Sequence, residues 1–281
     1  MVKNKNILQK IVAYIFLSVL GIVMIYPLLW MLASSFKETS DIFNSISIIP
    51  PTLDIQYYIE GWKGVGEYTF ATFFKNTFIL VIPATIFTVI SCSIVAYGFA
   101  RFEFPLKKIL FTAMLATLML PSSVLIIPRY LLFRDLQWLN TYLPFIVPAM
   151  FAGNSFFIFQ LIQFFRGIPK ELDEAASIDG CSTWRIYTDI LMPLCKPALI
   201  SVALFNFIWG WNAFFEPLIY ISSVNKYPLS LALRMTLDLG SAAAWNEIFA
   251  MSVLSIAPPI IIFFCAQDYF IEGISSSGLK G

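Results

Sequence analysis

R-G-I-P-K-E-L-D-E-A-A-S-I-D-G-C-S-T-W-R-I-Y-T-D-I-L-M-P-L-C-K-P, residues 166–197, is a long polar interval between two apolar runs of membrane length. It carries signals for the start and the end of a helix. Pro169 suits the first position of a helix, and the acidic residues that follow it favour the positive end of the helix dipole. We therefore expect a helix to begin at Pro169.

A second helix is expected in the same interval. Gly180 lies where a left-handed residue ends the first helix without steric cost. Ser182 or Thr183 then caps the next helix, and Pro193 ends it because proline has no amide hydrogen. The interval predicts a short helix, a glycine corner and a second short helix.

The chain is far more apolar than a soluble domain. Of its 281 residues, 59% are hydrophobic and 12% are charged, and the mean hydropathy is +0.79. About a quarter of the residues of a soluble domain are charged. The net charge is +1, so no overall field attracts nucleic acid or an acidic partner. The composition predicts an all-α polytopic membrane protein.

Six apolar runs are long enough to cross a hydrocarbon core, which needs about 20 residues. The first run is too long for a signal peptide and is followed by no small-residue cleavage site before Lys37. An even number of spans places both termini on one side of the membrane. The predicted spans are residues 11–33, 77–100, 109–132, 142–165, 198–221 and 249–271.

The distribution of lysine and arginine orients these spans. If the termini lie inside, the inner segments hold 11 of the 18 basic residues and the outer segments hold 7. The excess falls in the short loops and the N-terminal tail, where the positive-inside rule is strongest. We expect cytoplasmic termini and a cytoplasmic 166–197 loop. The aromatic outer loop, residues 36–75, either lies along the membrane interface or contacts an external partner.

Three features stand out inside the spans. Small side chains recur every fourth residue in the second span and predict close packing against another helix. Glu216, the one acid of the fifth span, either has a functional role or reaches interfacial water. Trp209 and Trp211 of the fifth span either stack on a solute or pack within the protein. The small residues of the second span are Ala84, Thr88, Cys92, Ala96 and Ala100.

Several chemistries are excluded by what the sequence lacks. It has no histidine, no C-x-x-C pair and no G-x-x-x-x-G-K-[ST] phosphate loop. We therefore expect no metal, no histidine-dependent catalysis and no ATP hydrolysis by this chain. Apolar residues of the 166–197 loop would face water unless the loop docks onto a soluble partner or lies on lipid headgroups. They are Leu172, Ala176, Trp184, Ile186 and Ile190.

The spacing E174-A-A, three residues, Gly180, nine residues, Ile190, one residue, M192-P resembles the EAA loop of permease subunits in binding-protein-dependent ABC importers. Further segments are similar to the smaller maltose-type subunit of the carbohydrate-uptake branch. Two departures are Ala213 after Asn212, where W-N-E-F is usual, and Asp268, where a basic residue is usual. The similar segments are P51-T-L-D-I-Q-Y-Y, N76-T-F, A96-Y-G-F-A-R-F-E-F-P-L-K-K, L139-N-T-Y and Y269-F-I-E-G-I-S-S-S-G-L-K-G.

The resemblance implies a permease that binds no cofactor itself and takes up a carbohydrate, with ATP and Mg held by a separate ATPase. The implied partners are a second permease subunit, two ATPase subunits, an external solute-binding protein and membrane lipid. The resemblance implies an N-terminal tail of residues 1–10, a transmembrane domain of residues 11–271 and a C-terminal tail of residues 272–281. Implied site residues are Glu174, Ala175, Ala176, Asp179, Gly180, Trp184, Ile190 and Pro193 for ATPase coupling, Trp209, Trp211, Asn212 and Glu216 for a solute pathway, and Gly273 and Lys280 for a tail contact.

Two other interpretations remain open. A permease of the same kind for a non-sugar solute, such as glycerol phosphate, would have the same loop. A self-sufficient secondary transporter would need titratable groups or an ion site inside the membrane and usually has internal repeats. A polytopic membrane enzyme is disfavoured, because the chain lacks histidine and paired carboxylates within its spans.

Overall fold

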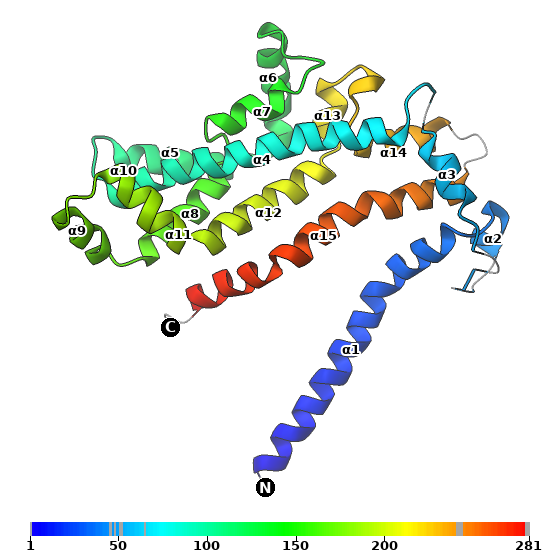
Figure 1. Ribbon diagram of the computed structural model, residues 1–281, viewed down its shortest axis with the longest axis horizontal. Coiled ribbons are helices and arrows are strands. Elements are labelled where there is room, and N and C mark those ends of the chain that lie inside the picture. Colours follow the sequence, from blue (N-terminus) through cyan, green and yellow to red (C-terminus); the bar gives the residue numbers. More distant parts are fainter. Residues whose placement is uncertain are drawn as a thin grey trace. The chain divides into compact units, whose positions relative to one another are not determined.

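The chain is mostly helical over the residues described by this computed structural model, which are 2–44, 47, 49–50, 53–64, 66–239 and 244–278. Within these ranges no β-strand is formed, as expected of an all-α membrane protein (Figure 1). The first helices are α1 (Val2–Ser34), α2 (Thr39–Asn44), α3 (Gln56–Trp62), α4 (Phe70–Arg101), α5 (Lys107–Leu118), α6 (Ser122–Asp135), α7 (Leu143–Met150) and α8 (Ser155–Gly167). They are followed by α9 (Glu171–Ile178), α10 (Thr183–Arg185), η1 (Ile186–Leu191), α11 (Met192–Leu194), α12 (Lys196–Asn212), α13 (Phe215–Tyr220), η2 (Val224–Lys226), α14 (Leu229–Leu239) and α15 (Trp245–Gly278).

Four stretches are long and apolar enough to cross a membrane, and two further pairs of helices qualify if each bent pair counts as one span. The prediction of six spans therefore corresponds to counting each bent pair as one span. At about 1.5 Å per residue, the 32 residues of α4 extend over about 48 Å, well beyond a hydrocarbon core of about 30 Å. The four stretches are Gln9–Ser34, Phe70–Arg101, Leu143–Gly167 and Trp245–Tyr269.

The predicted span 109–132 is not one continuous helix. Helices α5 and α6 meet at a bend of 105°, with Pro121 in an extended conformation at the start of α6. Proline restricts the residue before it to non-helical conformations, which explains the break at this point. The predicted span 198–221 is also interrupted, because α12 ends at Asn212 and Ala213 is extended before α13 begins.

The chain forms two compact units. The first unit contains the residues up to Phe70 together with Leu233–Ala257. Within it, Trp30 of α1 packs edge-on against Phe249 of α15, and Thr39 of α2 donates a hydrogen bond to Asn246 at 3.2 Å. Most apolar side chains of α1 are exposed in the isolated chain, as expected of a helix that faces lipid or another subunit.

The second unit, Ala71–Ala232 together with the residues from Pro258 onward, holds the core of the molecule. Here the predicted strip of small residues on α4 is confirmed as a packing surface. Cys92, Ala96 and Ala100 are buried in one cluster with large apolar side chains of α8, among them Phe157 and Phe165. The small side chains let a second helix approach α4 closely. Thr88 is also buried, whereas Ala84 is partly exposed.

Candidate functional site

The 166–197 loop begins with α9, which starts at Glu171, two residues later than predicted. The acidic residues expected at the positive end of the helix dipole do lie in its first turn. Gly180 has φ = +79°, so the predicted left-handed residue is confirmed. The Cys181 amide donates to Ala176 O at 2.9 Å and the Gly180 amide to Ser177 O at 3.1 Å, which completes a Schellman motif.

The second helix of the loop begins at the cap that the sequence predicts and ends later than predicted. Of the two candidate caps, Ser182 takes the role, with its Oγ accepting from the Arg185 amide at 3.4 Å. The helix continues as α10, η1 and α11 through Pro193 and ends at Cys195, so the prediction that Pro193 stops it was wrong. The η1 segment is π-helical and the Met192 amide bonds to Tyr187 O, five residues back. These wider turns let Pro193 continue the helix despite its missing amide hydrogen.

The loop has a buried inner face and an exposed outer face. Ala176, Ile186 and Leu191 belong to the core cluster, and Ile190 packs partly against it. The expectation that Ala176 and Ile186 face outward was therefore wrong: these side chains hold the loop against the protein. The exposed residues include Leu172, Glu174, Ala175, Ile178, Asp179, Gly180, Trp184 and Pro193.

Large apolar side chains on the outer face lack cover in the isolated chain. Ile178 is 87% exposed and Trp184 is 61% exposed. Glu174 and Asp179 are exposed as well. Exposed apolar groups rimmed by charge are typical of a surface that contacts another molecule.

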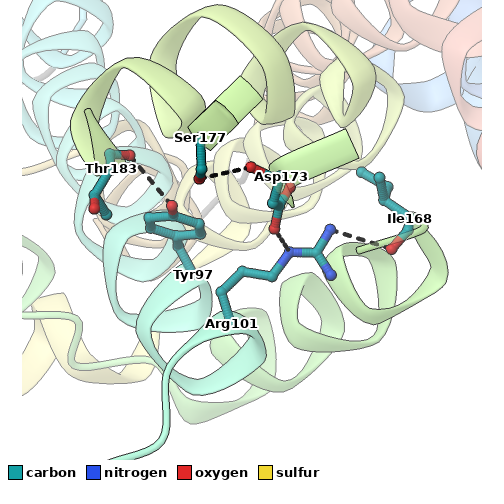
Figure 2. Close-up of polar contacts among 6 residues, drawn as sticks. All are labelled: Tyr97, Arg101, Ile168, Asp173, Ser177 and Thr183. Atoms are coloured by element: carbon teal, nitrogen blue, oxygen red, sulfur yellow. Dashed lines mark hydrogen bonds and ion pairs between the residues drawn. The ribbon is translucent and has the colours of Figure 1, made fainter. Parts of the chain in front are cut away.

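One face of α4 holds the inner side of this loop through polar contacts. The Ser93 hydroxyl lies 2.7 Å from the Tyr187 hydroxyl, and the Tyr97 hydroxyl donates to Thr183 O at 3.2 Å. Arg101, in the last turn of α4, donates from Nη2 to Ile168 O at 3.1 Å (Figure 2). These residues recur every fourth position, so they lie on one helix face.

Arg101 also forms an ion pair with Asp173 of α9. Arg101 Nε lies 2.7 Å from Asp173 Oδ2, within the distance of an ion pair. The contact does not have the geometry of a hydrogen bond. Only 5% of the Arg101 side chain and 19% of the Asp173 side chain are exposed. Burial raises the pKa of the Asp173 carboxyl above its ordinary value, although Arg101 and Lys170 act in the opposite direction.

Sequence reasoning missed this contact surface on α4. Arg101 was counted only as a basic residue at the inner end of a span, and Tyr97 was assigned no role. The spacing of Ser93, Tyr97 and Arg101 is visible in the sequence, directly beside the strip of small residues. Their partners are not visible, because they lie about 70 to 90 residues away in the chain.

The residues predicted for a solute pathway have different surroundings. Trp211 is only 5% exposed and packs against Phe78 and Phe207, as the packing alternative predicts. Trp209 is half exposed and stacks on Phe157. Asn212 donates to Ile208 O within its own helix at 2.8 Å.

The acid of the fifth predicted span has a partner. Glu216 Oε1 lies 3.7 Å from Arg129 Nη1, and both side chains are 45% exposed. Glu216 thus has a basic partner, and neither side chain is deeply buried in the isolated chain. Of the tail residues, Gly273 lies within α15, and Lys280 lies outside the described residues. Among the described residues, no group of three metal-ligating side chains is found.

These features define a polytopic helical membrane protein with a two-helix loop that exposes apolar and charged side chains. The family described as "Binding-protein-dependent transport system inner membrane component" matches residues 88–276, and the chain belongs to this family. It is thus a permease component of a transport system.

The relatives and a solved structure agree with this membership. The chain is 34% identical to a putative ABC transporter permease protein of Caldicellulosiruptor sp., over 95% of this chain and 96% of the relative. It is 32% identical to the arabinooligosaccharides transport system permease protein AraQ of Halalkalibacterium halodurans, over 93% of each chain. It is 31% identical to the sn-glycerol-3-phosphate transport system permease protein UgpE of Salmonella typhi, over 92% and 94%. A bacterial ABC transporter that imports the acidic polysaccharide alginate shares the fold, with a TM-score of 0.83, 24% identity and coverage of 95% and 98%.

Proposed function

We propose that this chain is one of two permease subunits of an ATP-driven importer that takes up a carbohydrate by alternating access. The observation that carries the proposal is the two-sided 166–197 loop. Its inner face is fixed to the core, while its outer face exposes Ile178, Trp184 and the carboxylate of Glu174. Such a surface suits a cleft on a separate ATPase subunit, with Glu174 paired to a basic group there.

The orientation of the loop follows from the charge distribution. Both termini and the 166–197 loop are cytoplasmic in this proposal, because most basic residues then lie inside. The ATPase, with its ATP and Mg, is a cytoplasmic partner, and the external solute-binding protein meets the opposite side. The 272–281 tail is directed toward the ATPase subunits.

The mechanism requires a difference in binding between two conformations. ATP-driven closure of the ATPase dimer shifts the permease only if the closed dimer binds one permease conformation better than the other. The exposed face of α9 and α10 is where this difference acts. Glu174, Ala175, Asp179, Gly180 and Trp184 are its contact residues in this proposal, with Ile190 and Pro193 behind them.

The class of solute is proposed from the relatives. Two named relatives transport arabinooligosaccharides and diacetylchitobiose, and the protein of similar fold imports alginate. We therefore favour an oligosaccharide. Glycerol phosphate is the second candidate, because several UgpE proteins are about equally similar to this chain.

Reconstitution tests the proposal. We expect the chain to purify with a second permease and two ATPase copies, and proteoliposomes containing this complex and the cognate solute-binding protein to accumulate labelled oligosaccharide only when ATP is enclosed. Accumulation of glycerol phosphate instead would support the second candidate. Uptake by the purified chain alone, driven by an ion gradient, would contradict the importer and indicate a secondary transporter.

A further inference from the structure

The cytoplasmic half of α4 carries two parallel strips of side chains, one apolar and one polar. Cys92, Ala96 and Ala100 form the apolar strip that is buried against α8. Ser93, Tyr97 and Arg101 are displaced from these by one position and form a polar strip. Every residue of the polar strip contacts the 166–197 loop.

The polar strip reaches both helices of the loop. Ser93 and Tyr97 contact the second helix, at Tyr187 and Thr183. Arg101 contacts the first helix at Asp173 and the entrance of the loop at Ile168 O. Arg101 is thus a junction of three elements, α4, α8 and α9, as Figure 2 shows.

Of these contacts, only the one at Arg101 ties α9 to α4 by a side-chain pair. Helix α9 is eight residues long and has one buried side chain, that of Ala176. It therefore has little apolar packing of its own to fix its position against α4. The pairing of Arg101 with Asp173 supplies a directional contact that the small Ala176 does not.

The electrostatics indicate that this pair is a poor stabiliser of the fold. The pKa of Asp173 in the folded chain is raised, so the native state favours the protonated carboxyl more than the unfolded chain does. The stability linked to this carboxyl is therefore fully present below its unfolded pKa and is lost as the pH rises through its raised folded pKa. Asp173 Oδ1 is also buried and accepts no hydrogen bond from a described residue. A buried ion pair with these properties is better explained by the position it enforces.

We propose that the Arg101–Asp173 pair makes α9 and the cytoplasmic end of α4 move as one body, so that a displacement of α9 by the ATPase is transmitted directly to α4. Arg101 is a positioning residue and touches no solute or nucleotide. This inference rests on the proposed docking of the 166–197 loop to an ATPase subunit. Without the pair, the displacement of α9 reaches α4 only indirectly, through the second helix of the loop and its contacts with Ser93 and Tyr97.

The test measures uptake per ATP hydrolysed in the reconstituted complex. Arg101→Gln and Asp173→Leu are each expected to lower this ratio about tenfold, within the usual range of coupling between sites. The double variant Arg101→Met/Asp173→Leu should lower the ratio no further, because both single changes break the same contact. Since it leaves no unpaired buried charge, the double variant also keeps the test valid if a single variant fails to assemble.

Two matched variants show whether the pair itself matters. Asp173→Glu keeps a carboxylate and should retain most of the wild-type ratio. Glu103→Gln removes the neighbouring ion pair between Glu103 and Lys107. The Glu103 side chain is 88% exposed, so this change should leave the ratio unchanged. A wild-type ratio in the assembled double variant would overturn the inference.

Hydrogen exchange separates this inference from the proposed function. In the wild-type complex, closing the ATPase with a non-hydrolysable nucleotide should change exchange in both α9 and residues 93–101 of α4. In the double variant the change should persist in α9 and become smaller in 93–101, where only the contacts of Ser93 and Tyr97 with the loop remain. An equal response of 93–101 in both proteins would overturn the inference alone, whereas no response of α9 in the wild type would overturn the proposed docking.

Discussion

Gly180 determines the corner between the two helices of the 166–197 loop. Its φ of +79° is unfavourable for any residue with a Cβ. The space around it is open, because a Cβ at this position would have no atom within 4 Å beyond its neighbours in the chain. The penalty for substitution is therefore one of backbone conformation and not of steric clash. A left-handed conformation costs an ordinary residue about 1 kcal/mol or more.

We expect Gly180→Ala to weaken the corner by about 1 kcal/mol. The Cys181 amide, which donates to Ala176 O across the corner, should then exchange its hydrogen about fivefold faster. Gly167→Ala is the control, because Gly167 also has open space but no left-handed φ. Equal exchange of the Cys181 amide in wild type and Gly180→Ala would show that the corner does not depend on glycine.

At the scale of single residues, local signals predicted backbone roles well and side-chain environments less well. Gly180 and Ser182 follow from helix-end chemistry that acts over a few residues, and the structure confirms both. Ala176 was expected to face outward and is buried, because burial depends on partners far away in the sequence. Arg101 was missed for the same reason, since Asp173 lies on another helix.

The segment between α13 and α14 is held by two asparagines far from it in the sequence, Asn76 in α4 and Asn140 between α6 and α7. Asn76 Nδ2 donates to Asn225 O at 2.8 Å and to Tyr227 O at 3.0 Å. Asn140 Oδ1 accepts from the Ser222 and Ser223 amides, and its Nδ2 donates to the Ser223 hydroxyl. Both asparagines belong to segments, N76-T-F and L139-N-T-Y, that the sequence singled out without a physical role.

We expect Asn140→Ala to destabilise this segment by about 1–3 kcal/mol, because two backbone amides lose their acceptor and the residue at φ = 58° becomes alanine. Limited proteolysis within residues 221–228 should be faster in the variant. Asn140→Asp keeps the acceptor for both amides and should lie between wild type and Asn140→Ala. If Asn140→Ala is cut no faster than wild type, the asparagine does not hold the segment.

At the scale of elements, hydropathy located the apolar runs and did not predict their direction. Residues 109–132 form a continuous apolar run, yet the chain bends by 105° before Pro121. The same residue type has the opposite outcome at Pro193, where π-helical turns carry the helix onward. Whether a proline breaks a helix depends on the turns around it, which a sequence pattern does not show.

For the whole molecule, family membership and architecture are consistent at every level. Composition predicted a polytopic helical protein, and the structure, the family model and the solved relative agree with it. The arrangement of the spans across the membrane and the residues of the ATPase contact remain proposals. They rest on charge distribution and on the exposed face of α9 and α10.

Photo-cross-linking from the 166–197 loop tests the central claim most directly. A photoreactive amino acid at position 178, where the isoleucine is 87% exposed, is introduced into the complete complex in its native membrane. The same amino acid at position 53, where the leucine of the outer loop is 75% exposed, is the matched control. We predict a covalent product with the ATPase subunit from position 178 and none from position 53. Cross-links from position 178 to lipid alone, or an ATPase product from position 53, would contradict the account.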